Sequence, residues 1–132
     1  MYSDFLSEVS IFSELSSEEL DNLNQYVSLR EYPKGSMIIL EEEYGDVVFI
    51  IKSGTIKITR VNDEGKEVIL SLLGKYEIFG EMSIIDGESR SANALAQEKC
   101  ELLAIKSEDF LSLLKSNFKI TFSLFASTII RL

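Results

Sequence analysis

The feature that most constrains the fold is an alternation of short β-prone runs with turn signals between residues 33 and 105. The runs cover residues 37–40, 47–51, 55–61, 68–73, 91–96 and 101–105. Turn signals recur about every 8–12 residues, and Gly65 ends an Asn-Asp-Glu-Gly tip where it can take a positive φ. Short strands at this spacing indicate a sandwich or β-roll that closes on itself to hide its edges.

A helical pattern precedes the β-prone region. Residues 3–27 predict helix, and Ser16 and Glu19 fit the Ser-x-x-Glu capping box. Behind the box, apolar residues recur at helical spacing, at Leu20, Leu23 and Val27. We expect this amphipathic segment to cover the β region, with Phe5, Ile11, Phe12 and Leu15 as its apolar lead-in.

Two further helices are predicted after the β region. Ser107 is expected to cap the first, with Glu108 and Asp109 near the positive end of its dipole. The second begins at Phe118 and carries apolar residues at coiled-coil spacing, namely Phe118, Phe122, Phe125, Ile129 and Leu132. This seam could pack on the β region, but its narrow stripe favours a homodimer. The helix reaches Leu132 without a C-cap and is expected to be truncated.

Together these patterns predict a mainly β fold with flanking helices. The expected architecture is a double-stranded β-helix, a jelly-roll-like β-roll, with N-terminal helices and two C-terminal helices. One domain is expected for 132 residues. We divide it into an N-terminal helical segment (1–28), the β-roll (29–106) and the C-terminal helices (107–132).

The residue types that are missing exclude several function classes. The chain has no histidine and one cysteine, Cys100. Histidine-based metal sites and Ser–His or Cys–His nucleophiles are therefore excluded, as is an iron–sulfur cluster held by four thiolates of this chain. We expect no enzyme and no metal. Redox sensing by Cys100 is the less favoured reading, because a strand position favours a buried, inert thiol.

Charge and hydropathy limit the partners and the compartment. The net charge is −9, from 22 acidic and 13 basic residues, so nucleic-acid binding by this chain itself is not expected. The N-terminus has no signal-peptide pattern, and the longest apolar run, Val47–Ile51, is too short to cross a membrane. A single cysteine fits a reducing compartment, so we expect a cytoplasmic protein without a membrane partner.

The stretch from Phe79 to Ala94 is the one part of the sequence with the chemistry of a ligand site. It holds a Gly-Glu pair, a short apolar run, an Asp-Gly turn and an arginine followed by small residues. Glu81 and Arg90 lie nine residues apart, and the Asp-Gly turn breaks any helix between them. A short helical turn beginning near Met82 or Ser83 would let both side chains face one pocket.

The groups in this stretch suit a sugar phosphate. Amides at a helix start and the planar fork of Arg90 can bind phosphate oxygens. The carboxylate of Glu81 only accepts hydrogen bonds and suits a sugar hydroxyl. A structural ion pair between Glu81 and Arg90 is the alternative that this chemistry leaves open.

The residues of this stretch also carry a family resemblance. Phe79-Gly80-Glu81-Met82-Ser83-Ile84-Ile85 and Arg90-Ser91-Ala92 resemble the phosphate-binding cassette of the cyclic-nucleotide-binding domain family. Elsewhere, Tyr32–Gly35 and Asp63–Val68 are similar to a turn and a hairpin of that family. Within it, the chain resembles the N-terminal sensor domains of bacterial cyclic AMP receptor protein-type transcription regulators.

The resemblance implies a cyclic AMP or cyclic GMP ligand, of which we expect cyclic AMP. Glu81 would hold the ribose 2′-hydroxyl and Arg90 the cyclic phosphate. Further contacts are implied for Gly80, Met82, Ser83, Ser91 and Ala92. The chain departs from the family at Tyr76 and Glu42, where glycine is usual, and these departures concern loop shape rather than the pocket.

The resemblance also implies a role. The family's bacterial regulators continue past the last helix into a DNA-binding domain, so this chain resembles their sensor half, and DNA is the expected partner of a full-length regulator. The alternative is a ligand-free β-roll that dimerises or docks onto a partner.

Overall fold

The computed structural model describes residues 1–39, 46–81 and 92–131, without the side chains of residues 127–131. The strands are β1 (Val27–Tyr32), β2 (Met37–Ile39), β3 (Val47–Ser53), β4 (Ile56–Val61), β5 (Glu67–Leu73), β6 (Ile78–Phe79), β7 (Asn93–Ala96) and β8 (Cys100–Lys106). The helices are α1 (Ser3–Leu6), the 3₁₀ turn η1 (Ser10–Phe12), α2 (Ser17–Asn24), α4 (Ser107–Ser116) and α5 (Phe118–Arg131).

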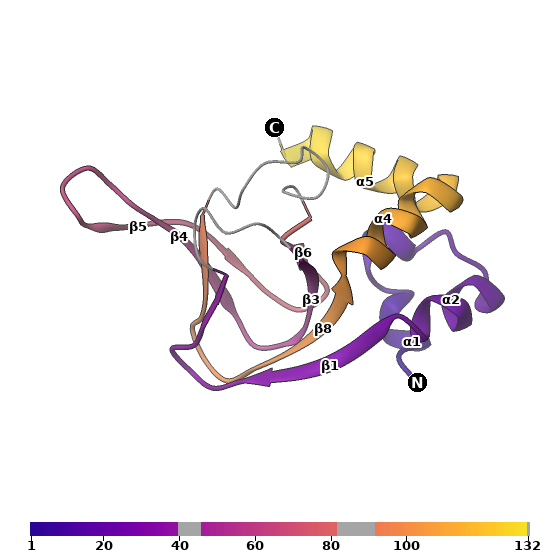
Figure 1. Cartoon of the computed structure of the whole chain (residues 1–132), viewed down its shortest axis with the longest axis horizontal. Coiled ribbons are helices and arrows are strands. Elements are labelled where there is room, and N and C mark those ends of the chain that lie inside the picture. Colours follow the sequence, from indigo (N-terminus) through magenta and orange to yellow (C-terminus); the bar gives the residue numbers. More distant parts are fainter. Residues whose placement is uncertain (40–45, 82–91, 132) are drawn as a thin grey trace.

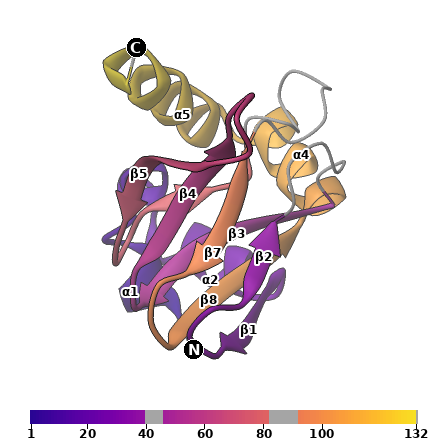
Figure 2. The same ribbon diagram turned by 90° about the vertical axis from the view of Figure 1, so that its left-hand side faces the viewer.

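The strands form two four-stranded antiparallel sheets. Their strand orders are β1-β8-β3-β6 and β2-β7-β4-β5, and we name them sheet A and sheet B. The helices gather at one end of the molecule, while the β4–β5 hairpin projects from the other (Figure 1). The view turned by 90° shows sheet B in front, with α1 and α2 behind it (Figure 2). The predicted mainly β roll with flanking helices is confirmed.

Sheet A separates two apolar clusters. Val48 and Ile50 of β3 join a cluster on the helix side, which includes Phe12 of η1 and Phe110 of α4. The alternate residues of β3 join a second cluster between the sheets, with side chains from β7 and β8. Since successive side chains of a strand point to opposite faces, one apolar run supplies both clusters. This explains why residues 47–51 are buried without an alternating pattern.

The N-terminal helix α2 begins as the capping-box pattern predicted. The Ser16 hydroxyl accepts a hydrogen bond from the Glu19 N–H at 3.2 Å, and the Glu19 carboxylate accepts one from the Ser16 N–H at 3.0 Å. Leu20 and Leu23 are buried in the helix-side cluster. Val27 does not continue this stripe as predicted, because it is the first residue of β1.

The sequence prediction missed two strands, β1 and β6, and placed one helix cap at the wrong residue. β1 was missed because four of its six residues are exposed and it shows no clear alternation. β6 was missed because it has only two residues. α4 begins at Ser107 as predicted, but Ser107 is not its cap. The N-cap residue is Lys106, which has an extended backbone and whose side chain makes no capping hydrogen bond. No helix in the described ranges is long and apolar enough to span a membrane.

Candidate functional site

The first half of the candidate site is positioned by β6. Phe79 pairs with Phe49 of β3 in the sheet register, and their rings stack with centroids 5.2 Å apart. The ring of Tyr32 in β1 lies edge-on to that of Phe49, with centroids 6.3 Å apart. Because β6 is the edge strand of sheet A, this aromatic packing fixes where the chain leaves the sheet for Gly80 and Glu81.

Gly80 and Glu81 follow β6 directly, and one has an unusual backbone conformation while the other is unusually buried. Gly80 has a φ of +89°, a conformation that side chains disfavour and glycine adopts readily. Glu81 is only 2% exposed. Among the side chains that the structure describes, it is the one charged group that is buried. Charged side chains are rarely buried in proteins, so a buried glutamate at this turn is a candidate binding residue.

The second half of the stretch returns to the opposite sheet. Ala92 is a partly buried bend residue directly before β7. Ala94 and Ala96 of β7 face Ile58 and Ile56 of β4 and are buried in the cluster between the sheets. Phe79 belongs to the same cluster. The candidate cassette therefore begins at sheet A and ends at sheet B, and residues at both of its ends belong to the same apolar cluster.

Of the predicted site residues, the structure describes Gly80, Glu81 and Ala92. Met82, Ser83, Arg90 and Ser91 lie outside the described residues, as does the short helical turn predicted between them. Their roles stay predictions.

Tyr76 lies two residues before β6, at a position where the resembled family usually has glycine. Its φ is +76°, which is rare for a residue with a side chain. The ring stacks on Phe5 of α1 with centroids 4.8 Å apart, and the Tyr76 N–H donates to the Ile51 carbonyl of β3 at 2.8 Å. Packing of the ring against α1 therefore maintains a conformation that glycine would adopt without strain.

Cys100 has the surroundings of a structural thiol. It is fully buried, and its sulfhydryl contacts the carbonyl oxygens of Thr55 and Glu98 at 3.4 and 3.2 Å. Burial raises the pKa of this thiol. A buried thiol with a raised pKa is a poor nucleophile, as its strand position predicted.

Comparisons of sequence agree with this geometry. A family model for the cyclic nucleotide-binding domain matches residues 29–117. The chain is 40% identical over 105 residues to the cyclic AMP receptor protein of Thermus thermophilus, covering 80% of this chain and 49% of that protein. It is 35% identical over 99 residues to human cGMP-dependent protein kinase 2, covering 74% of this chain and 13% of the kinase.

A comparison with solved structures also finds a bacterial regulator. The crystal structure of the Thermus thermophilus catabolite activator protein matches with a TM-score of 0.84 and 37% identity. The match covers 92% of this chain and 57% of that one. The chain thus spans about half the length of the bacterial relatives that it matches.

Proposed function

The chain belongs to the cyclic nucleotide-binding domain family, and we propose that it is a sensor that binds cyclic AMP in preference to cyclic GMP, without catalysis. The observation that carries the proposal is the Gly80–Glu81 pair. Gly80 has a left-handed φ and Glu81 is buried, and both observations support the ligand contacts that the cassette resemblance implies for this pair. The higher identity to the bacterial cyclic AMP receptor protein than to the cGMP-dependent kinase supports cyclic AMP.

In the proposed complex, each half of the cassette has a separate task. Glu81 accepts a hydrogen bond from the ribose 2′-hydroxyl, and Arg90 holds two oxygens of the cyclic phosphate. Gly80, Met82 and Ser83 contribute backbone groups, while Ser91 and Ala92 lie beside the phosphate or base. Since the net charge of −9 opposes long-range attraction of an anion, recognition depends on these short-range, charge-assisted hydrogen bonds.

We further propose that the chain is the regulatory half of a cytoplasmic transcription regulator, dimeric through α5. Phe118, Phe122 and Phe125 are 79%, 59% and 64% exposed, which supports a seam open to a second copy. The opposite side of α5 packs inward through Ile120 and Leu124. Ile129 and Leu132, also assigned to the seam, lie outside the described side chains. DNA binding belongs to a further domain of the full-length regulator.

The seam can be tested by changing one of its central residues. Phe122→Glu should shift the chain from dimer toward monomer in sedimentation velocity, because two facing carboxylates would repel each other. Leu111→Glu is a matched control, since Leu111 is an exposed apolar residue of α4 outside the seam. A dimer that survives Phe122→Glu unchanged would contradict this assignment.

Ligand binding can be tested by a thermal-shift series with cyclic AMP, cyclic GMP, 5′-AMP and inorganic phosphate. A ligand that binds only the folded state raises the melting temperature with its concentration. We expect cyclic AMP to give the largest shift and inorganic phosphate none. No shift with either cyclic nucleotide at millimolar concentration would favour the alternative, a ligand-free β-roll that dimerises or docks onto a partner.

A further inference from the structure

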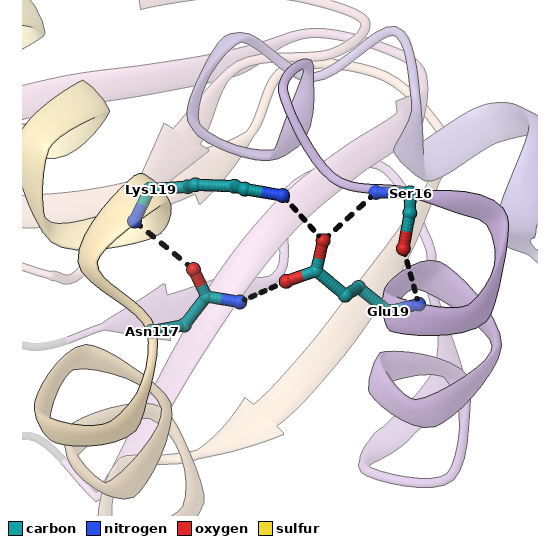
Figure 3. Close-up of polar contacts among 4 residues, drawn as sticks. All are labelled: Ser16, Glu19, Asn117 and Lys119. Atoms are coloured by element: carbon teal, nitrogen blue, oxygen red, sulfur yellow. Dashed lines mark hydrogen bonds and ion pairs between the residues drawn. The ribbon is translucent and has the colours of Figure 1, made fainter.

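A polar cluster outside the nucleotide cassette joins the N-terminal helix α2 to the junction of α4 and α5 (Figure 3). Its centre is the carboxylate of Glu19. One oxygen accepts hydrogen bonds from the Lys119 ammonium at 2.7 Å and from the Ser16 N–H at 3.0 Å. The other oxygen accepts a hydrogen bond from the Asn117 side-chain amide at 2.8 Å. The capping-box residue of α2 therefore also binds a segment about 100 residues later in the chain.

The segment that Glu19 binds is the hinge between the two C-terminal helices. Asn117 lies between α4 and α5 and has an extended backbone, with φ −128° and ψ 103°. Its N–H donates to the Leu113 carbonyl of α4, and its carbonyl accepts from the Thr121 N–H of α5. The backbone of Asn117 thus links both helices, so its conformation determines the angle at which α5 leaves α4.

The side chain of Asn117 has two partners at once. Its carbonyl oxygen accepts a hydrogen bond from the Lys119 N–H at 3.0 Å, which satisfies one of the unpaired donors at the start of α5. Its amide group donates to Glu19. A rotation of the hinge away from this position would break the bond to Glu19 and would move Lys119 with it.

Apolar side chains of α2 and α5 also belong to one cluster, and a groove opens beside this contact. A groove of about 440 Å³ lies between them, and its lining includes Leu15, Leu23, Leu113 and Ile120 beside Glu19 and Asn117. The hydrogen bonds of Glu19 link α2 to the hinge beside this groove.

The strength of the cluster suits a reversible contact. The side chains of Glu19 and Lys119 keep 31% and 49% of their exposure. Exposed ion pairs stabilise weakly and are screened by salt, so the contact biases a position without locking it. The hydrogen bonds from Lys119, the Ser16 N–H and Asn117 lower the pKa of Glu19 from 4.5 to about 2, so the carboxylate is ionised at neutral pH.

We propose that Glu19, Asn117 and Lys119 form a latch that holds α5 at its observed angle to the roll. The latch biases the direction in which Phe118, Phe122 and Phe125 point, because all three lie on the helix that begins at this hinge. Release of the latch would let α5 move relative to η1 and α2. Use of this motion in signalling rests on the proposed function, whereas the latch itself does not.

The test measures the position of α5 directly. Spin labels on Ser28→Cys in β1 and Ala126→Cys in α5 report the distance between these two elements, while the fully buried Cys100 stays unlabelled. Labelled chains are diluted with unlabelled chains so that only distances within one copy are measured. The parent should give one narrow distance distribution.

Two variants release the latch in different ways. Glu19→Gln removes the charge that pairs with Lys119, and Lys119→Met removes the ammonium while it leaves the capping box of α2 intact. Both should broaden or shift the distance distribution. Glu18→Gln is the matched control, because it removes the same charge one residue away, and it should reproduce the parent. Circular dichroism confirms that each variant is folded.

The outcomes separate the latch from nucleotide binding. If Glu19→Gln and Lys119→Met both give the parent's distance distribution, the latch is wrong, whatever the chain binds. The same samples are then titrated with cyclic AMP by calorimetry. A broadened distribution without cyclic AMP binding in any sample would support the latch and overturn the proposed function.

Discussion

The strands β3 and β5 are similar in sequence and opposite in environment. Val47-Val48-Phe49-Ile50-Ile51 is an apolar, β-prone run, and Val68-Ile69-Leu70-Ser71-Leu72 is another that is apolar except for Ser71. The first lies inside sheet A between two apolar clusters, and all five of its residues are buried. The second lies at the edge of sheet B, and all five of its residues are exposed. An apolar run thus predicts a strand, but its place in the sheet decides whether it forms the core.

The largest difference in unfolding free energy is expected when the same Ile→Ala substitution is compared between the two strands. Ile50 is fully buried and Ile69 is 54% exposed. Ile50→Ala should lower the free energy of unfolding by about 2–5 kcal/mol, because it removes buried methyl groups and leaves a cavity. Ile69→Ala should cost less than about 1 kcal/mol, as exposed substitutions usually do. Chemical denaturation of both variants measures the difference, and equal losses would contradict the contrast.

A second contrast compares two turns: the one after the buried strand β3 and the one that joins β4 to the exposed strand β5. Gly54 and Gly65 have φ values of +94° and +77°. A Cβ on Gly54 would lie 2.6 Å from the Cys100 sulfur and 2.7 Å from the Lys99 carbonyl oxygen, whereas one on Gly65 would meet nothing within 4 Å. The two positions therefore share backbone strain but differ in crowding.

Alanine at each glycine separates these two causes. Gly65→Ala should cost about 1–2 kcal/mol, because it adds only the strain of a left-handed conformation. Gly54→Ala should cost about 2–4 kcal/mol, because the steric clash with the start of β8 is added. Thermal unfolding followed by circular dichroism measures both. A loss at Gly54 no larger than that at Gly65 would show that the turn relaxes freely.

The smallest effect on the free energy of unfolding is expected for the partly exposed contact between Glu19 and Lys119. The pKa of Glu19 is lowered from 4.5 to about 2, chiefly by Lys119. A lowered folded-state pKa contributes stability that is fully present above pH 4.5 and is lost as the pH falls toward 2. The difference in unfolding free energy between the parent and Glu19→Gln should therefore shrink between about pH 5 and pH 2. A constant difference over this range would contradict the assigned contact.

Local signals predicted much of this fold. The capping box of Ser16 and Glu19 and the positive φ of Gly65 were correct because each depends on residues adjacent in sequence. β1 was missed because its residues are mostly exposed, and its pairing with β8 joins residues far apart in the chain. The contact of Glu19 with Asn117 could not be predicted for the same reason, since it spans 98 residues.

The candidate site shows the same division between local and distant information. The motif singled out Gly80 as a site residue but predicted no conformation for it, and its left-handed φ is known from the structure alone. The burial of Glu81 does not follow from local pattern, because it depends on how β6 meets β3. The roles assigned to Arg90 and Ser91 stay predictions.

The central claim is that this domain binds a cyclic nucleotide through Glu81 and Arg90. It is tested most directly by calorimetric titration of the parent and Arg90→Ala with cyclic AMP, with Lys34→Ala as a control that removes an exposed positive charge elsewhere. The parent and Lys34→Ala should bind with equal affinity. Arg90→Ala should raise the dissociation constant roughly 30- to 1000-fold, because a charge-assisted contact to the phosphate is lost. An Arg90→Ala variant that binds cyclic AMP as tightly as the parent would contradict the claim.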